Sequence, residues 1–194
     1  MMPGDEDLIK ERLAWAQWWA APWRYAHEDW TSIDKYAAID SLYRNGVSIN
    51  LNAIGIAPCL PPAPNPTLLR LVLASSEHLN LMLMLINCTF NPVPTTPLSN
   101  DHQLWCMRLS KALPSDTLLP IDDPLQLLHS WVDPAIWHRL RLRFPYERVL
   151  ETEKKYLPLE NGHGRLDTLW QAFIWRATAM TSVNAHPDLN EQGT

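Results

Sequence analysis

The side chains of this chain that are best suited to proton transfer or metal binding are seven histidines and a pair of adjacent carboxylates. No two histidines have the spacing that places metal ligands on one helix face, although His129 and His138 lie in neighbouring predicted helices and are able to approach each other. Asp122 and Asp123 adjoin, but Asp123 precedes Pro124 and is better interpreted as a helix cap. The sequence therefore predicts no metal site.

The sequence signatures of common catalytic sites are missing. The chain has no Gly-x-Ser-x-Gly turn and no His-Glu-x-x-His pair, and its six glycines are too scattered to form a phosphate-binding loop. A small helical enzyme of another chemistry would need a deep pocket with convergent histidine and carboxylate groups. We expect a protein that has no catalytic residues and no cofactor, and that acts by binding other proteins.

Tryptophan is concentrated near the N-terminus, where five of the ten indoles fall between Trp15 and Trp30. Each indole can bury roughly 200 Å² and needs a partner for its N–H group, so most of them are expected in the core. Tryptophan is also enriched at protein interfaces, which leaves a contact role open. The first set of candidate protein-binding residues is Trp23, Tyr25, His27 and Trp30.

Four arginines gather between His138 and Arg148 in a chain whose net charge is −5. Arg139 and Arg143 are four residues apart and share a helix face, so with Trp175 they form the second set of candidate protein-binding residues. Pairing within the chain is the alternative, because three acidic residues follow closely: Glu147, Glu151 and Glu153. Binding of nucleic acid would need a broader basic surface.

Trp175 lies on the outer face of a predicted amphipathic helix over residues 165–181. The opposite, apolar face of that helix is expected to carry Leu166, Leu169, Trp170, Phe173, Ile174, Ala177 and Met180. The indole of Trp175 must therefore cover another segment of this chain or contact a partner, and the sequence leaves both possibilities open.

Prolines divide the chain into segments with helical periodicity, and the fold class predicted is all-α. The expected helices span residues 5–21, 31–44, 67–87, 100–113, 124–132, 134–143, 145–156 and 165–181. Residues 47–57 alternate like a strand over a short window, and we expect a loop or a short helix there. Residues 58–66 and 92–97 are proline-rich connectors.

The first predicted helix has a broad apolar arc, which predicts contacts with more than one neighbour. One stripe contains Leu8, Trp15 and Trp19, and the neighbouring stripe contains Ile9, Leu13, Ala16 and Ala20.

Length and composition predict one helical domain over residues 1–183 and a polar tail over residues 184–194. The negative net charge gives no general attraction to nucleic acid or anionic lipid. Three cysteines without a Cys-x-x-Cys pair favour a reducing, cytoplasmic location. The most apolar stretch, Leu68 to Ile86, is interrupted by charged and polar residues and is expected to be a core helix rather than a membrane span.

Two short stretches resemble a known family. Residues Trp105 to Pro114 resemble a Trp-Cys-x-Arg-Leu-Ser-x-x-Leu-Pro stretch of the Yersinia-type adaptor subunit of the type III secretion sorting platform, the SctK family, which includes the YscK, PscK and Hrp-system homologues. Residues Ala21 to His27 are similar to its Cys-Pro-x-x-Tyr-x-His stretch, with Pro22, Tyr25 and His27 matching and the cysteine absent. About eighty residues follow Pro114, and the Arg-Leu-Arg-Phe-Pro segment at 141–145 has no counterpart that we can quote.

The resemblance implies a non-enzymatic cytoplasmic adaptor. Such a protein links the cytosolic domain of the inner-membrane ring protein to the pod protein, which leads through the stator to the export ATPase. It inserts into no membrane and reaches the inner membrane through its partner. The alternative is a type III secretion chaperone or regulatory protein that binds one client; such a chaperone is often a smaller α/β dimer.

Overall fold

The computed structural model describes residues 3–33, 36, 38–47, 49–63, 65–92, 97–113, 123–155 and 163–179. In these ranges every regular element is an α-helix or a 3-10 helix, and none is a strand. The all-α prediction is therefore confirmed. Asp122, Met180 and the predicted tail from residue 184 lie outside the described residues.

The chain divides into two compact units. The first comprises Met1–Leu73 with Pro120–His163, and the second comprises Ala74–Leu119 with Gly164–Thr194. The prediction of a single domain over residues 1–183 stays a prediction.

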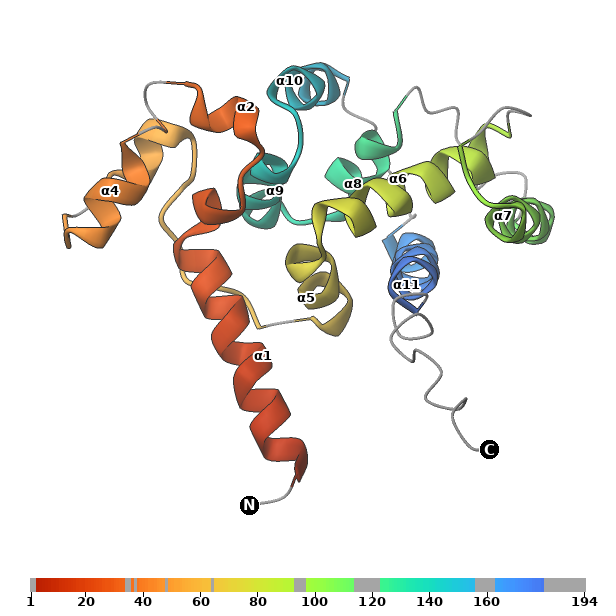
Figure 1. The fold of residues 1–194 in the computed structure, drawn as a ribbon, viewed down its shortest axis with the longest axis horizontal. Coiled ribbons are helices and arrows are strands. Elements are labelled where there is room, and N and C mark those ends of the chain that lie inside the picture. The colour runs from red at the N-terminus through yellow and green to blue at the C-terminus, as the bar shows by residue number, and fades with distance from the viewer. Residues whose placement is uncertain are drawn as a thin grey trace, which may run out of the picture. The chain divides into compact units, whose positions relative to one another are not determined.

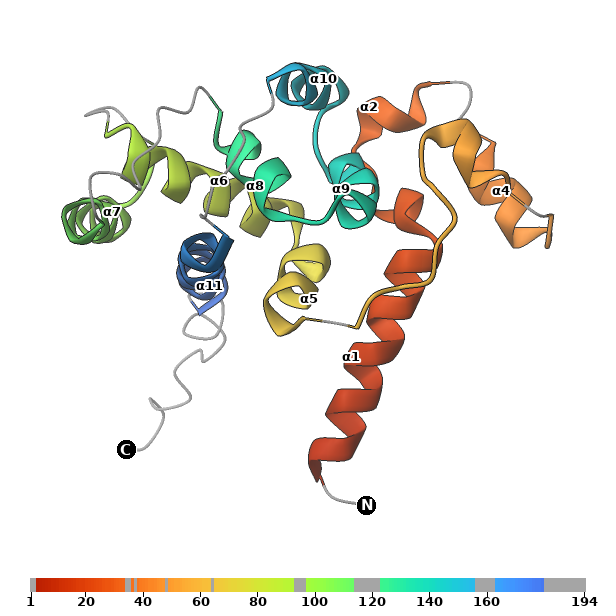
Figure 2. The same ribbon diagram turned by 180° about the vertical axis from the view of Figure 1, so that it is seen from behind.

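The first unit contains one long helix, α1, and a set of short ones (Figures 1 and 2). Its elements are α1 (Pro3–Ala20), η1 (Pro22–Tyr25), α2 (Glu28–Thr31), α4 (Ile39–Arg44), η2 (Leu51–Ile54), α5 (Pro66–Leu73), α8 (Pro124–Trp131), α9 (Pro134–Leu140), η3 (Arg141–Arg143) and α10 (Tyr146–Lys154). Both views show α5 beside α1, and the segment before α5 runs along α1 as an extended strip.

The two Asp-Pro pairs begin α8 and α9, as the sequence predicts. Asp123 accepts a hydrogen bond from the Leu125 amide at 2.7 Å, and Asp133 accepts one from the Ala135 amide at 2.8 Å. Each carboxylate satisfies a free N–H group of the first helical turn, while the following proline has no N–H group to satisfy. Asp123 also pairs with Arg148 of α10 through two hydrogen bonds of 2.7 and 2.8 Å, which ties α8 to α10.

The second unit contains α6 (Ser76–Phe90), α7 (Asn100–Ala112) and α11 (His163–Ala179). The α6 and α7 helices pack along each other, and the Cys106 thiol of α7 donates a hydrogen bond to the Leu85 carbonyl of α6 at 3.4 Å. Trp105 meets Phe173 of α11 edge to face, with ring centroids 5.6 Å apart. The predicted apolar face of α11 is confirmed for its described residues, which are all buried: Leu166, Leu169, Trp170, Phe173, Ile174 and Ala177.

The predicted helix over residues 67–87 is in fact two helices, α5 and α6. The Ser75 hydroxyl caps α6 by accepting a hydrogen bond from the His78 amide at 3.2 Å. Serine competes with the helical hydrogen-bond pattern in this way and so starts a new helix inside an apolar run. In the described part of the chain, no single helix is long and apolar enough to cross a membrane. Only α5 and α6 taken together, across their break, meet that criterion, by length and composition alone.

The predicted helix over residues 31–44 is also wrong as a single helix, because α2 ends at Thr31 and α4 covers Ile39–Arg44. His27 caps α2, because its ring nitrogen Nδ1 accepts a hydrogen bond from the Asp29 amide at 3.3 Å. The predicted end at residue 44 is confirmed, since α4 ends at Arg44 and is followed by Asn45 and by Gly46, which has a φ angle of 69°.

Candidate protein-binding surfaces

Three indoles of α1 form a cluster that holds the proline-rich connector. Trp15, Trp18 and Trp19 are buried, and neighbouring ring centroids lie 5.2 to 6.1 Å apart. The Trp15 indole donates a hydrogen bond to the Pro62 carbonyl, and the Trp19 indole donates one to the Cys59 carbonyl, both at 3.0 Å. The connector is thereby fixed against α1 by its own carbonyl groups.

Arg139 was predicted to contact a partner, but its side chain is inside the first unit with an exposed fraction of 1%. The guanidinium lies 3.8 Å from the Trp19 ring centre and donates hydrogen bonds to the carbonyls of Trp19, Ala135 and Ala57 at 3.2, 2.9 and 3.3 Å. Burial lowers the pKa of Arg139, and neighbouring Cys59 partly offsets this effect. The residue joins α1, α9 and the connector, so its predicted role at the surface is corrected to a structural one.

Arg143 is buried as well and donates a hydrogen bond to the Val72 carbonyl of α5 at 2.7 Å. Its guanidinium lies 5.9 Å from the Tyr25 ring centre, and burial lowers its pKa. The direct contact with a partner that the sequence suggested is therefore corrected for Arg143 too. Arg139 lies in α9 and Arg143 in η3, so the two do not share the face of one α-helix as predicted, and both side chains are buried.

The alternative of internal ion pairing is confirmed at Arg141. Its guanidinium donates to Glu153 Oε1 at 2.8 Å, and the same oxygen accepts the Trp137 indole N–H at 2.8 Å. Burial raises the pKa of Glu153, but the hydrogen bonds from Arg141 and Trp137 outweigh burial and leave the pKa below its usual value. Glu153 therefore remains ionised and links α10 to α9 and η3.

Two of the four predicted contact residues in the first set belong to the core. Trp30 has an exposed fraction of 2%, and its indole donates a hydrogen bond to the Phe144 carbonyl at 2.8 Å. Trp23 is buried and meets Tyr43 edge to face at 5.5 Å. Neither indole is reachable by a partner in this structure, so the contact role predicted for both is corrected to packing.

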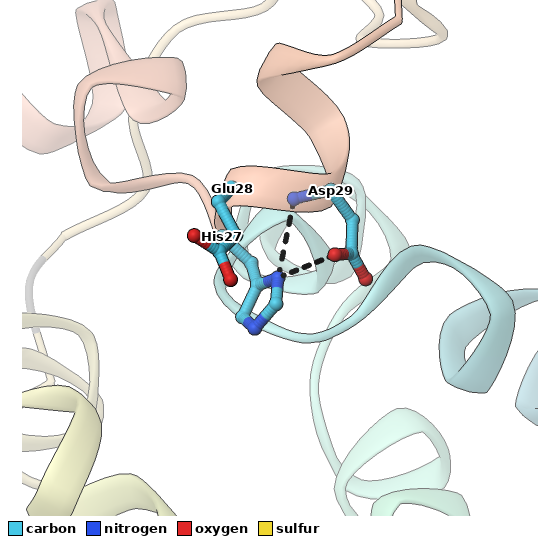
Figure 3. A group of neighbouring side chains, drawn as sticks. All are labelled: His27, Glu28 and Asp29. Carbon is cyan, nitrogen blue, oxygen red and sulfur yellow. Dashed lines mark hydrogen bonds and ion pairs between the residues drawn. The ribbon is translucent and has the colours of Figure 1, made fainter.

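Tyr25 and His27 are accessible. Tyr25 is 40% exposed, and the His27 side chain is partly exposed beside Glu28 and Asp29 (Figure 3). The ligand atoms of these three residues all lie within 4.8 Å of one another, a spacing compatible with a cation. However, His27 Nδ1 already accepts the Asp29 amide, and Asp29 Oδ2 accepts the amide of Tyr146 at 3.2 Å. The described contacts therefore give this group the role of a helix cap that joins α2 to α10.

His129 and His138 are near enough for their charges to interact, as the sequence allowed. The His129 ring lies 4.5 Å from the Trp137 ring, and burial lowers the pKa of both histidines. The charge of His138 lowers the pKa of His129 further, whereas nearby Glu153 raises it. In the second unit, burial and then the charge of Arg176 lower the pKa of His102.

These lowered pKa values predict a loss of stability in mild acid. Folding favours the neutral imidazoles of His102, His129 and His138, whereas the unfolded chain binds protons near the usual histidine pKa. The stability that is present above the usual pKa is therefore lost as the pH falls below it. Tm is expected to fall between about pH 7.5 and about pH 5.5, a window in which Asp123 and Glu153 stay ionised. His129→Gln is expected to reduce this fall, as measured by circular dichroism; an unchanged pH dependence in the variant contradicts the assignment.

Trp175 is the most exposed aromatic residue in the described chain, with an exposed fraction of 59%. The outward orientation predicted for it is confirmed, and α11 turns its other aromatic residues, Trp170 and Phe173, inward. Its indole is the clearest candidate for a contact between the second unit and another protein.

The sequence did not predict two further groups of exposed apolar side chains. On α7, Leu104 and Met107 are each 48% exposed. They share a face with Arg108 and Lys111 at helical spacing, and both basic residues are exposed. The second group lies on α1, where Leu8, Ile9 and Leu13 are 46 to 56% exposed. The broad apolar arc of this helix predicted contacts with more than one neighbour, but the part of the arc that carries these three residues is left exposed.

No family model matches the chain, and neither a curated protein nor a solved structure matches it.

Proposed function

We propose that this chain is a non-enzymatic cytoplasmic adaptor of a type III secretion sorting platform. It links the cytosolic domain of the inner-membrane ring protein to the pod protein and, through the stator, to the export ATPase. The observation that carries the proposal is the stretch from Trp105 to Pro114, which resembles that of the adaptor family. It binds no nucleic acid and inserts into no membrane, and its position at the inner membrane comes from its partner.

The described part of this stretch supports a role in binding. Cys106 is buried against α6, whereas Leu104, Met107 and Arg108 are exposed on the other side of α7. One side of the helix therefore holds the second unit together, and the other side offers aliphatic groups beside basic ones. Such a face suits a partner surface that carries apolar and acidic groups.

Trp175 is proposed to contact one of the two partners, and Trp175→Ala tests this. Because the indole is 59% exposed, its loss is expected to leave Tm unchanged. Loss of a central tryptophan contact is expected to weaken the complex about 30-fold, measured as Kd by calorimetry with the purified ring domain or pod protein. Leu60→Ala is the matched control, since Leu60 is 89% exposed in the connector of the other unit. A clear fall in Tm on Trp175→Ala contradicts the contact role.

The function itself is tested by affinity purification of the tagged chain from its native host. Recovery of both the ring protein and the pod protein supports the adaptor. Recovery of one secreted client without either of them supports the chaperone or regulatory protein instead, and overturns the proposal. A turnover that depends on a histidine or an acidic side chain overturns it as well.

A further inference from the structure

The long helix α1 packs against the rest of its unit only near its C-terminal end. Its three buried tryptophans, Trp15, Trp18 and Trp19, all lie in its last six residues. Every residue from Glu6 to Leu13 is exposed. A helical segment of this length is only marginally stable in water on its own, so an exposed apolar face on it calls for a covering partner.

The uncovered face of α1 is a regular apolar stripe. Its members follow one another at intervals of four, three and four residues and are all exposed: Ile9, Leu13, Ala16 and Ala20. The two large residues lie toward the N-terminus of the helix and the two small ones toward its C-terminus. When two copies of the stripe run antiparallel, the large residues of one therefore lie opposite the small residues of the other.

We propose that this stripe pairs with the same stripe of a second copy of the chain, with the two α1 helices antiparallel. In this register Ile9 lies opposite Ala20 of the second copy, and Leu13 lies opposite Ala16. Each large side chain then meets a small one, so the helices approach closely without a void or a clash. The arrangement has two-fold symmetry, as most protein dimers do, and each partner contributes the same residues.

The charges of α1 fit the same register. The acidic residues Glu6 and Asp7 extend past Ala20, the last residue of α1 in the second copy, and so meet no like charge of that helix. Lys10 and Arg12 come opposite the uncharged residues Trp19 and Gln17, so no like charges meet. The two helix dipoles also run in opposite directions, which is favourable.

The mixed charge of the helix favours a second copy over a lipid surface. An amphipathic helix that lies on a membrane is typically rich in lysine and arginine along its polar face. Lys10 and Arg12 are here interspersed with Glu6, Asp7 and Glu11, and Lys10 lies 3.8 Å from Asp7 within the helix. The proposal rests on α1 alone and does not depend on the proposed adaptor function.

Sedimentation equilibrium of the full chain, over a wide range of concentrations, tests the pairing. The wild type is expected to be in equilibrium between monomer and dimer. Ala16→Leu puts leucine against Leu13 of the second copy and is expected to raise the dimer Kd about tenfold or more. The double variant Leu13→Ala with Ala16→Leu exchanges the large and small positions and is expected to restore the wild-type Kd.

Leu8→Ala is the matched control, because Leu8 is 46% exposed on α1 but lies off the stripe, and its dimer Kd is expected to stay unchanged. A wild type that remains monomeric at every concentration overturns the proposal. A dimer Kd that falls on Ala16→Leu also overturns the proposal, because it indicates association of apolar surfaces without the predicted match of large and small residues. Binding of the monomer to anionic phosphatidylserine vesicles, without self-association, assigns the stripe to a membrane and overturns it too.

Discussion

Replacement of Arg139 by alanine is expected to destabilise the first unit by about 3 kcal/mol or more, because a buried charged donor and its ring contact are lost together. The substitution leaves the carbonyls of Trp19 and Ala57 without the donor they have in the interior, and it removes the guanidinium that lies over the Trp19 ring. With a urea m-value of about 2 kcal/mol/M, the midpoint of unfolding is expected to fall by about 1.5 M. Circular dichroism in urea measures it.

Two controls show whether the geometry of Arg139, and not charge alone, carries this effect. Arg139→Lys keeps the charge but cannot form the planar fork, so we expect it to lose a large part of the stability. Arg108→Ala removes an exposed arginine and is expected to change stability by about 0.5 kcal/mol or less. An Arg139→Ala variant as stable as the wild type would contradict the buried position of the side chain.

The second large effect is expected at Trp30. Trp30→Ala removes an indole that is 2% exposed and stacks edge to face with Tyr36 and Tyr146 at 5.3 and 4.8 Å. Truncation of a buried aromatic side chain costs about 3 to 5 kcal/mol, and here the Phe144 carbonyl also loses its donor. The expected result is a Tm lower by roughly 10 °C, measured by circular dichroism.

Trp175→Ala serves as the comparison, because the same substitution is made at an exposed position. Trp30→Phe separates packing from hydrogen bonding, since it keeps an aromatic ring and loses only the N–H group, and a smaller fall in Tm is expected. If Trp30→Ala and Trp175→Ala gave equal Tm values, the assignment of Trp30 to the core would fail.

The sequence predicted most helices because their boundaries are local. Prolines stop helices whatever surrounds them, and Asp123 and Asp133 cap the helices that follow them through contacts only two residues away. The break after Leu73 was missed because apolar periodicity continues across it, and Ser75 reads equally well as an interior residue. A serine inside an apolar run is compatible with both a helix interior and a helix cap, and only the hydrogen bonds of its hydroxyl distinguish the two.

The candidate contact residues were harder to predict because burial is decided by residues far apart in the chain. Two of the three acceptors of Arg139 lie 82 and 120 residues away, at Ala57 and Trp19, and the sequence of the arginine-rich segment does not indicate them. Trp175 was placed correctly because its own helix defines which face is apolar. The exposed position of Leu104 could not be predicted because α7 buries a less apolar face, which carries His102 and Cys106.

The connector between η2 and α5 touches the indoles through main-chain oxygens, those of Cys59 and Pro62. Every amino acid offers that oxygen, so the identity of the side chains there matters little to this contact. The spacing matters much more: one residue inserted or deleted shifts an extended chain by about 3 Å, half of the roughly 6 Å that separates Trp15 from Trp19 along the helix. Among related sequences, the residue types of this connector are expected to vary while its length stays constant.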